Sequence, residues 1–523
     1  MTADFKPQSS KDRPWRWLMA PALAALYPVL FQYADSASDA NVRDIVTSGF
    51  VVVAAAILVA LLFRFVFVGA PRAGIAAFAF VVWCFAFSSF VRVGRYIVES
   101  ICVTPYRDYY IYTFWILLIF PALYLVGRYR GSEHRIEQLY KLALLACIAS
   151  IGLAAVQGAC GYLREHQAGN TPGSIWESDQ PAIPATWKPQ PIAERRDIYY
   201  LLLDRYGSEQ ALQEFFGFDD SEMYNELEKR GFVVDRKAIT SYPMTSTSMA
   251  STLNMRWLNS QVAKTSDYFS SVGANDVGKW FMKAGYKYLF FGNQYTGLRN
   301  SSIADWNLKV SVMPSEFADS LVSMTPFRPL IGREHKHIFS AQKFRAVAEV
   351  AKDPSLTFAY AHFLVPHPPY AFARDGSRQT EINRATLPEK ELYIDQLVAT
   401  NRMVLQAIDE ILSSSAVKPI IILQADEGPY LMDGDEPLTP AQKRAKRLGI
   451  LNAIFIPDDE IRQRLPKPLM PINTFRFLFK EYFDAPIELL PDRVFFWETP
   501  EPTGAAATGT RIIEVTQDVR AGK

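Results

Sequence analysis

The stretch "PIIILQADEGPY", residues 419–430, joins a continuous apolar run to a polar end. The run shows no alternation of apolar and polar side chains, which is typical of a strand buried on both faces. It ends at Asp426 and Glu427, after which Gly428 and Pro429 turn the chain. Carboxylates at the tip of a buried strand either bind a cation or cap neighbouring helices and turns. The stretch alone leaves both uses open.

Other apolar runs along the chain predict four more strands: "IYYLLL" (198–203), "KYLFFG" (287–292), "TFAYAHFLV" (357–365) and "ILNAIFI" (450–456). Amphipathic segments between the runs predict helices at 221–230, 245–253, 340–351, 389–412 and 473–483. Strands that alternate with helices predict an α/β domain with a central, mostly parallel sheet covered by helices. In such sheets, binding and catalytic residues gather at the carboxyl ends of the strands.

The first third of the chain is apolar in a different way. Five stretches, 17–33, 45–68, 73–91, 111–127 and 142–162, approach the ~20 residues that a helix needs to cross a bilayer. They predict an N-terminal transmembrane domain of about five helices. Most of the basic residues that flank these stretches fall on one side, which the positive-inside rule makes cytoplasmic: Lys6, Lys11, Arg13, Arg16, Arg64, Arg72, Arg128, Arg130, Arg135 and Lys141. The loop between the third and fourth stretches is the exception, because it carries Arg92, Arg95 and Arg107 on the other side.

An odd number of spans places the rest of the chain outside the cytoplasm. We predict a transmembrane domain over 1–162, a proline-punctuated linker over 163–196, an extracytoplasmic domain over 197–497 and a C-terminal tail over 498–523. The net charge is +1 and no basic stripe is present, which argues against nucleic acid as a partner. All four cysteines precede residue 163, so the α/β domain contains no thiol nucleophile.

A third acid follows another buried strand. Asp204 ends the first strand, in "YYLLLDRYG", and so lies at the same predicted edge of the sheet as Asp426 and Glu427. A single acid in this position is more often a cap than a ligand. Three acids at two strand ends favour a divalent cation, because like charges at close range need a counter-charge.

A cluster of hydroxyl residues opens the predicted helix at 245–253. In "SYPMTSTSMASTLNM" (241–255), Thr245, Ser246, Thr247 and Ser248 follow Pro243 and Met244. They fit an N-cap and a polar first turn, or a nucleophilic hydroxyl at a helix N-terminus, where free N–H groups favour an anion.

Two of the six histidines occur in "YAHFLVPHPPYAF" (360–372). His362 lies within a predicted strand, where a hydrogen-bonded core histidine is a sufficient explanation. His367 follows the strand in a proline-rich loop, a better position for contacting a leaving group or a substrate phosphate. Asn293 and Arg299, in "GNQYTGLRN", are weaker candidates for a phosphate contact, because a solvated loop explains them as well.

Together these segments resemble the membrane-anchored, sulfatase-like proteins of the alkaline phosphatase superfamily, whose members include the lipoteichoic acid synthases and phosphoethanolamine transferases. The similarity covers about 197–497, and several motifs occur in the expected order. By this resemblance, Asp204 and Asp426 take the positions of metal-ligating acids. Thr245 takes the position of the threonine that is both metal ligand and nucleophile, and His367 that of a substrate-contacting histidine. Five leading membrane spans imply a multi-pass protein of the bacterial inner membrane with a periplasmic or extracellular catalytic domain.

One position departs from the family pattern. Most relatives have Asp-His-Gly where this chain has Asp426, Glu427 and Gly428. A glutamate ligand adds a hard, charged oxygen in place of an imidazole nitrogen. We therefore expect a single divalent ion held by Asp204, Thr245, Asp426 and Glu427, with Mn²⁺ or Mg²⁺ favoured and Ca²⁺ or Zn²⁺ possible. Loss of activity is the alternative consequence of this exchange.

The resemblance implies transfer of a phosphoglycerol- or phosphoethanolamine-type headgroup from a membrane lipid donor to an envelope glycan or lipid acceptor. Thr245 and His367 would be the catalytic residues, and His362, His367, Asn293 and Arg299 would contact substrate. Two alternatives stay open at this point. The same site could hydrolyse a phosphate or sulfate ester, or the domain could be a non-catalytic protein that binds or assembles envelope polysaccharide.

Overall fold

The computed structural model describes residues 15–35, 42–101, 107–129, 132–168, 174–178, 180–189, 195–259, 265–293, 298–308, 316–327, 334–431, 438–497 and 512–520. The chain forms two compact units. One comprises Met1–Thr171 and Pro314–Gly332, and the other comprises Pro172–Met313 and Arg333–Lys523. These segments alternate along the sequence, so the chain passes from one unit to the other three times.

The first unit is helical. Its elements are η1 (Arg16–Leu18), α1 (Met19–Asp35), α2 (Val42–Val66), α3 (Ala70–Ile101), α4 (Arg107–Arg128), α5 (Glu133–Ala168) and α11 (Glu316–Ser323). Among the described residues, four stretches are long and apolar enough to cross a membrane: Ile45–Val66, Ala70–Gly94, Tyr110–Arg128 and His134–Gln157. Helix α1 has 17 residues, about 26 Å of helix, which falls short of ~30 Å of hydrocarbon. The predicted five-span count is therefore confirmed only for four helices.

Helix α11 comes from the middle of the sequence but packs within the helical unit. Its buried Phe317 and Leu321 contact Val29 of α1, and partly buried side chains from α1 and α2 surround them. Burial of apolar side chains is the main favourable contribution to such packing. Helix α11 therefore belongs to the helical unit, although in the sequence it lies between two segments of the α/β unit.

The second unit contains a seven-stranded sheet of order β2-β7-β6-β1-β5-β3-β4. The strands are β1 (Ile198–Leu203), β2 (Val233–Asp235), β3 (Lys287–Phe291), β4 (Trp306–Asn307), β5 (Thr357–Phe363), β6 (Ile420–Ala425) and β7 (Asn452–Phe455). Strand β1 pairs in parallel with both β5 and β6, and β3 pairs in parallel with β4 and β5. Strand β7 is antiparallel to both β6 and β2, so the sheet is mixed.

The antiparallel strand β7 has a local cause. After β6, helix α16 (Pro440–Leu448) stays at the carboxyl edge of the sheet instead of crossing a face. The Gly428 N–H there donates to the Arg447 carbonyl (2.8 Å), and the Leu451 N–H donates to the Tyr206 carbonyl (3.0 Å). The chain thus enters β7 from the edge where β6 ended, which forces the opposite direction. The continuous apolar run at 450–456 predicted the strand but not its direction.

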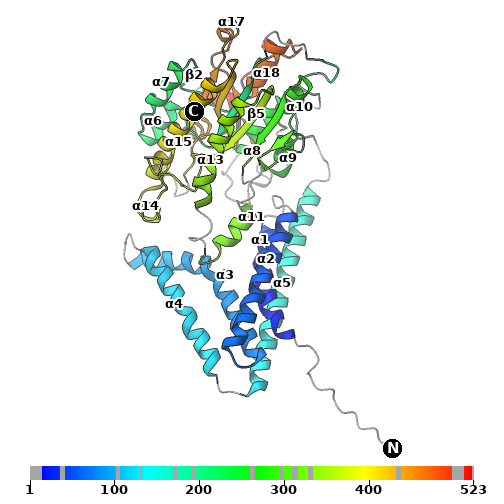
Figure 1. Cartoon of the computed structure of the whole chain (residues 1–523), viewed down its shortest axis with the longest axis vertical. Helices are drawn as coiled ribbons and strands as arrows, with labels where there is room; N and C mark the ends of the chain where they lie inside the picture. Colours follow the sequence, from blue (N-terminus) through cyan, green and yellow to red (C-terminus); the bar gives the residue numbers. More distant parts are fainter. Residues whose placement is uncertain are drawn as a thin grey trace, which may run out of the picture. The chain divides into compact units, whose positions relative to one another are not determined.

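Two apolar layers cover the sheet because successive strand residues point to opposite faces. In β1, Tyr200 and Leu202 join one core cluster, whereas Tyr199 and Leu201 join the other. Helices that contribute to the first cluster are α8 (Thr245–Asn254), α9 (Thr265–Gly273), α10 (Asp276–Lys283) and α18 (Pro471–Phe483). Helices that contribute to the second are α6 (Glu209–Phe216), α7 (Ser221–Lys229), α13 (Glu334–Glu349) and α15 (Glu389–Ser414). Figure 1 shows these two groups on the two sides of the strands.

Shorter elements complete the unit: η3 (Val350–Lys352), α14 (Glu381–Thr386), α17 (Asp459–Gln463), β8 (Phe495–Trp497), β9 (Ile512–Glu514) and α19 (Thr516–Arg520). Strand β9 and helix α19 lie within the predicted tail. Strand β9 pairs with β8, and Ile512 and Val515 join the core, so this part of the chain belongs to the α/β unit. In the predicted linker, Ile183 is fully buried in the same core.

Candidate functional site

Three buried side chains at the carboxyl edge of the sheet form the centre of the site. Asp204 follows β1, Asp426 follows β6, and His362 lies near the end of β5. Each of these side chains offers one ligand atom, and the three atoms all lie within 4.8 Å of one another. The central position of β1 between β5 and β6 explains this convergence, because parallel neighbours end at the same edge.

The imidazole of His362 is held from two directions. The side-chain amide of Asn293, in the loop after β3, hydrogen-bonds to Nδ1 of His362 (2.9 Å). On the other side, Nε2 of His362 lies 3.5 Å from Oδ2 of Asp204. Burial lowers the pKa of His362 to about 4, so the ring is neutral near pH 7. Nε2 can bind a metal ion in the tautomer that carries the proton on Nδ1, for which the Asn293 amide turns its oxygen toward the ring.

The backbone around His362 is fixed by a buried lysine. Lys343 of α13 donates from Nζ to the Gly292 carbonyl (2.5 Å) and to the His362 carbonyl (2.5 Å). These bonds join the ends of β3 and β5, which carry Asn293 and His362. Burial lowers the pKa of Lys343 to about 7. Lys343 therefore acts on the site through the backbone of these two strands.

Asp426 is surrounded by acids and by hydrogen-bond donors. Its Oδ1 accepts from the backbone N–H groups of Arg205 (3.2 Å) and Glu427 (2.9 Å). Burial, followed by the charges of Asp204 and Glu427, raises the pKa of Asp426 to about 7. A hydrogen bond with the Thr245 side chain acts in the opposite direction and lowers this pKa. Asp426 thus links the acidic group to the start of α8.

The hydroxyl residues of α8 differ in what they contact. Thr247 donates from Oγ1 to the Met244 carbonyl (3.1 Å), and Ser248 shares a hydrogen bond with Thr240 (2.9 Å). Ser246 is buried, and its Oγ has no hydrogen-bond partner among the described residues. Thr245 is half-buried at the first position of the helix and reaches Asp426. Of the four candidates, Thr245 is the one whose side chain affects the pKa of Asp426.

The loop after β5 places His367 beside the first strand. The His367 N–H donates to the Asp204 carbonyl (3.1 Å), and its ring Nδ1 hydrogen-bonds to the Pro368 carbonyl. Gln396 of α15 holds this loop by donating to the carbonyls of Pro366 and His367 (2.9 Å each). His367 is half-buried at the edge of the site, and its predicted contact with substrate stays a prediction.

Glu427 differs from its neighbour Asp426 in its contacts. Its side chain is 3% exposed and forms ion pairs with Arg205 (Nε to Oε1, 2.9 Å) and Arg447 (3.2 Å to Oε2). Gly428 makes the second pair possible, because a Cβ at this position would lie 2.2 Å from the Lys446 carbonyl oxygen. Glycine therefore lets the strand end lie directly against the end of α16, where Arg447 is located.

The three ligand atoms fit one cation. Ligands on opposite sides of a divalent ion at ~2.0–2.3 Å are separated by roughly 4–4.6 Å. The ligand atoms of Asp204, His362 and Asp426 all lie within 4.8 Å of one another, which is compatible with this separation. Nε2 of His362 also has no hydrogen-bond partner among the described residues, although it is buried. A buried nitrogen without a partner is costly unless a ligand such as a metal satisfies it.

The structure thus places Asp204, Asp426 and Thr245 close together, and their roles in metal binding and catalysis stay predictions. It adds His362 to the group, where we had expected a substrate contact, and joins Asn293 to His362. Glu427, predicted as a ligand, pairs with two arginines, and Arg299 is half-buried in the loop after β3. Sequence reasoning missed Arg205, although its position directly after Asp204 was a usable signal. It also missed Lys343, which no local pattern distinguishes.

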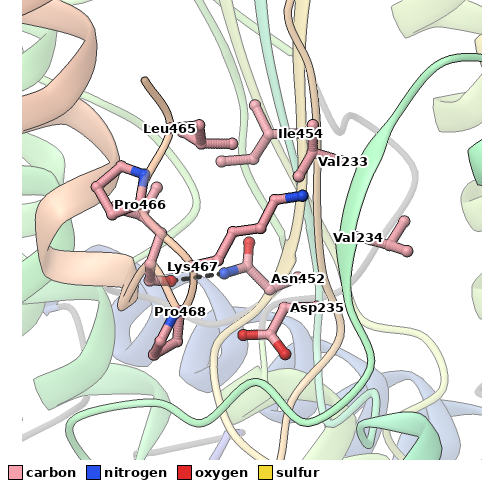
Figure 2. A pocket seen from close by; sticks show the side chains of 10 residues that line it. Val233, Val234, Asp235, Asn452, Ile454, Leu465, Pro466, Lys467 and Pro468 are labelled. Carbon is pink, nitrogen blue, oxygen red and sulfur yellow. Dashed lines mark hydrogen bonds between the residues drawn. The ribbon is translucent and has the colours of Figure 1, made fainter. Parts of the chain in front are cut away.

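Two hollows lie elsewhere in the α/β unit. One has a volume of about 20 Å³ and lies between β2, β7 and the loop 465–469, where Asn452 donates to the Leu469 carbonyl (2.8 Å) (Figure 2). That volume suffices for about one water molecule. The other, of about 560 Å³, is lined by residues that include Trp257, Arg256 and Arg476. Neither is lined by the residues of the acidic group.

No protein-family model and no curated protein matches the sequence. Solved structures do match it, at low identity. The C-terminal periplasmic domain of EptC from Escherichia coli is 14% identical to this chain, with a TM-score of 0.41, and the match covers 65% of this chain and 97% of that domain. A second structure of the same domain, in complex with zinc, also matches with a TM-score of 0.41. The lipooligosaccharide phosphoethanolamine transferase EptA from Neisseria meningitidis, an integral membrane protein, is 13% identical with a TM-score of 0.36, over 85% of this chain and 89% of that one. A protein in the alkaline phosphatase superfamily from Vibrio parahaemolyticus is 13% identical with a TM-score of 0.38, over 62% of this chain and 77% of that one.

Proposed function

We propose that this chain is a metal-dependent enzyme that transfers a phospho-headgroup from a membrane lipid to an envelope glycan or lipid. One observation carries the proposal. The Thr245 hydroxyl, at the N-terminus of α8, lies close enough to Asp426 to lower the pKa of that acid, and Asp426 belongs to a buried Asp–His–Asp group with ligand spacing. A hydroxyl, an anion-favouring helix end and a metal-type ligand set are the parts that attack on a phosphorus or sulfur centre requires.

Asp204, His362 and Asp426 would hold the metal, with the Thr245 oxygen as a further ligand. A bound divalent cation would supply positive charge that lowers the pKa of the hydroxyl and offsets charge on the reacting group. The preference for Mg²⁺ over Zn²⁺ depends on Glu427 as a metal ligand. The Glu427 carboxylate instead forms ion pairs with two arginines, so this reason for disfavouring zinc no longer applies. Two carboxylates and an imidazole suit Zn²⁺ or Mn²⁺.

In the first step, the Thr245 oxygen forms a bond to the phosphorus, and the bond from phosphorus to the leaving oxygen breaks. The first-turn N–H groups of α8 favour the negative charge of the phosphoryl oxygens. His367, held by Gln396 at the edge of the site, is positioned to protonate the leaving oxygen. An acceptor hydroxyl then displaces Thr245. The proton of the acceptor passes to His367, and the threonine oxygen, which released its proton to solvent in the first step, takes one back, so both residues are regenerated.

The helical unit supports a lipid substrate. In the described part of the chain, four helices are long and apolar enough to span a membrane, and the α/β unit begins after them in the sequence. Tethering to a membrane raises the effective concentration of lipid donors at the site. We place the α/β unit outside the cytoplasm of a bacterial inner-membrane protein, on the basis of the charges that flank the helices.

The test is mass spectrometry of the full-length protein taken from its native membrane. We expect an adduct on Thr245 whose mass identifies the transferred group. Thr245→Ala should lose the adduct, and Thr245→Ser should keep it at a reduced level. Thr247→Ala is the matched control, because Thr247 lies on the same turn but donates to the Met244 carbonyl.

The possible outcomes separate the alternatives. An adduct that moves to a glycan or lipid acceptor supports transfer, whereas release of free phosphate or sulfate supports hydrolysis at the same site. A Thr245→Ala variant that complements fully in cells would show a non-catalytic role and refute the proposal.

A further inference from the structure

The two arginines that hold Glu427 lie directly beside the acidic group. Arg205 follows Asp204 in the chain, and its backbone N–H donates to Asp426 (3.2 Å). Arg447 reaches the same Glu427 carboxylate from the end of α16. Both side chains are largely buried, at 14% and 11% exposed. A buried pair of guanidinium groups is costly to desolvate unless nearby charges compensate it.

An aromatic ring stabilises the pair. The guanidinium carbon of Arg205 lies 5.3 Å from the ring centroid of Tyr430, and that of Arg447 lies 4.7 Å from the same centroid. Arg447 also lies 5.5 Å from the ring of Trp497. Distances below about 6 Å allow cation–π attraction, which fixes the planes of the guanidinium groups.

The backbone of Arg205 is held in a conformation that its side chain does not favour. Its φ is +64°, in the left-handed region that residues other than glycine disfavour. Contacts on all parts of the residue hold it there: the N–H to Asp426, the carbonyl accepting from Tyr393 (2.9 Å), and the side chain to Glu427. Strain that the surroundings maintain is common where a side chain must face a ligand.

The charges around the pair favour an anion when a metal is bound. Among the described residues of this edge are three acids, Asp204, Asp426 and Glu427, and two arginines, Arg205 and Arg447. With a divalent cation in place, positive charges exceed these carboxylates by one. Lys446, next to Arg447 and buried against Phe216, adds to this excess.

We propose that Arg205 and Arg447, held by Glu427 and Tyr430, form an oxyanion-binding subsite beside the metal group. Its ligand is a tetrahedral phosphate or sulfate group of the substrate, which guanidinium groups recognise through paired hydrogen bonds. The inference rests on the proposed function, since it assigns a subsite within that active site. It gives Glu427 a use other than metal ligation: the residue that fixes the two arginines.

The experiment is calorimetric titration of the metal-loaded, full-length protein in detergent with inorganic phosphate. We expect Arg447→Met to weaken phosphate binding about 10- to 100-fold, as loss of a charge-assisted hydrogen bond predicts. Arg447→Lys keeps the charge without the planar fork and should weaken binding less. Arg493→Met is the control, because Arg493 pairs with Glu177 and Glu514 away from these residues. Metal content, measured in each variant, should stay at one ion per chain.

Equal phosphate affinity in wild type, Arg447→Met and Arg493→Met would overturn the subsite. The Lys variant keeps the test valid if the Met variant does not fold, since it preserves the buried cation. Failure of the proposed function has a different signature, namely absence of the Thr245 adduct and of bound metal in the wild-type protein.

Discussion

Asp426 and Glu427 are neighbours in sequence and have opposite surroundings. Asp426 lies among Asp204, His362 and Thr245, and its pKa is raised to about 7 by burial and by the nearby acids. Glu427 lies between Arg205 and Arg447, which neutralise it. A cation would relieve the repulsion around Asp426, whereas Glu427 is already satisfied. The end of β6 therefore carries one acid in the proposed metal group and one acid that pairs with arginines. The residue type alone does not reveal which acid has which role.

The sharpest test of this contrast compares metal retention in two variants. We expect His362→Gln to weaken metal binding at least about 100-fold, because loss of a ligand costs more than the 10- to 100-fold typical of outer partners. Glu427→Gln should leave the metal content unchanged. Metal analysis of protein purified without chelator, followed by competition with a calibrated chelator, measures both.

A matched control for both variants comes from Asp220, a buried acid outside the ligand group. Its carboxylate accepts hydrogen bonds from Tyr206 (2.7 Å) and Asn401 (2.8 Å), and Asp220→Asn should retain the metal. If Glu427→Gln lost the metal as readily as His362→Gln, the two strand-end acids would have the same role and the contrast would fail.

A smaller effect should follow from the residue that orients His362. Asn293 contacts Nδ1 of the ring (2.9 Å), so Asn293→Ala frees the imidazole to rotate and weakens metal binding by about 10- to 100-fold. Asn293→Asp should weaken it less, because a carboxylate oxygen accepts from a protonated Nδ1 and so orients the ring. The same chelator competition measures the metal affinity of the wild type and of the two Asn293 variants. Equal metal affinity in these three proteins would argue against His362 as a ligand.

The sequence predicted much of the α/β unit because its strands are unusually apolar. The run 198–203 coincides with β1, and the helix predicted at 245–253 is α8 with one more residue. Strand direction was harder, since β7 depends on where α16 lies. The role of Glu427 was hidden for a related reason. Its partner Arg447 is distant from Arg205 in the chain, and the close approach at Gly428 brings them together.

A pH dependence should follow from the raised pKa of Asp426. Without metal, its pKa is raised to about 7, so metal binding must displace a proton at lower pH. We expect metal affinity to rise about tenfold per pH unit as pH approaches 7 and then to level off. His362, with its pKa lowered to about 4, adds a second proton only near that pH.

The stability of the metal-free protein should change with pH in the opposite direction from the metal affinity. A folded-state pKa above the unfolded value means that the free energy of unfolding falls as pH rises from about 4 to about 7. Chelator competition between about pH 4 and 7 measures the metal affinity. Chemical denaturation over the same range measures the free energy of unfolding of the metal-free protein. Glu427→Gln should leave the pH at which metal affinity levels off within about one unit of the wild-type value, because its carboxylate is a secondary cause of the raised pKa.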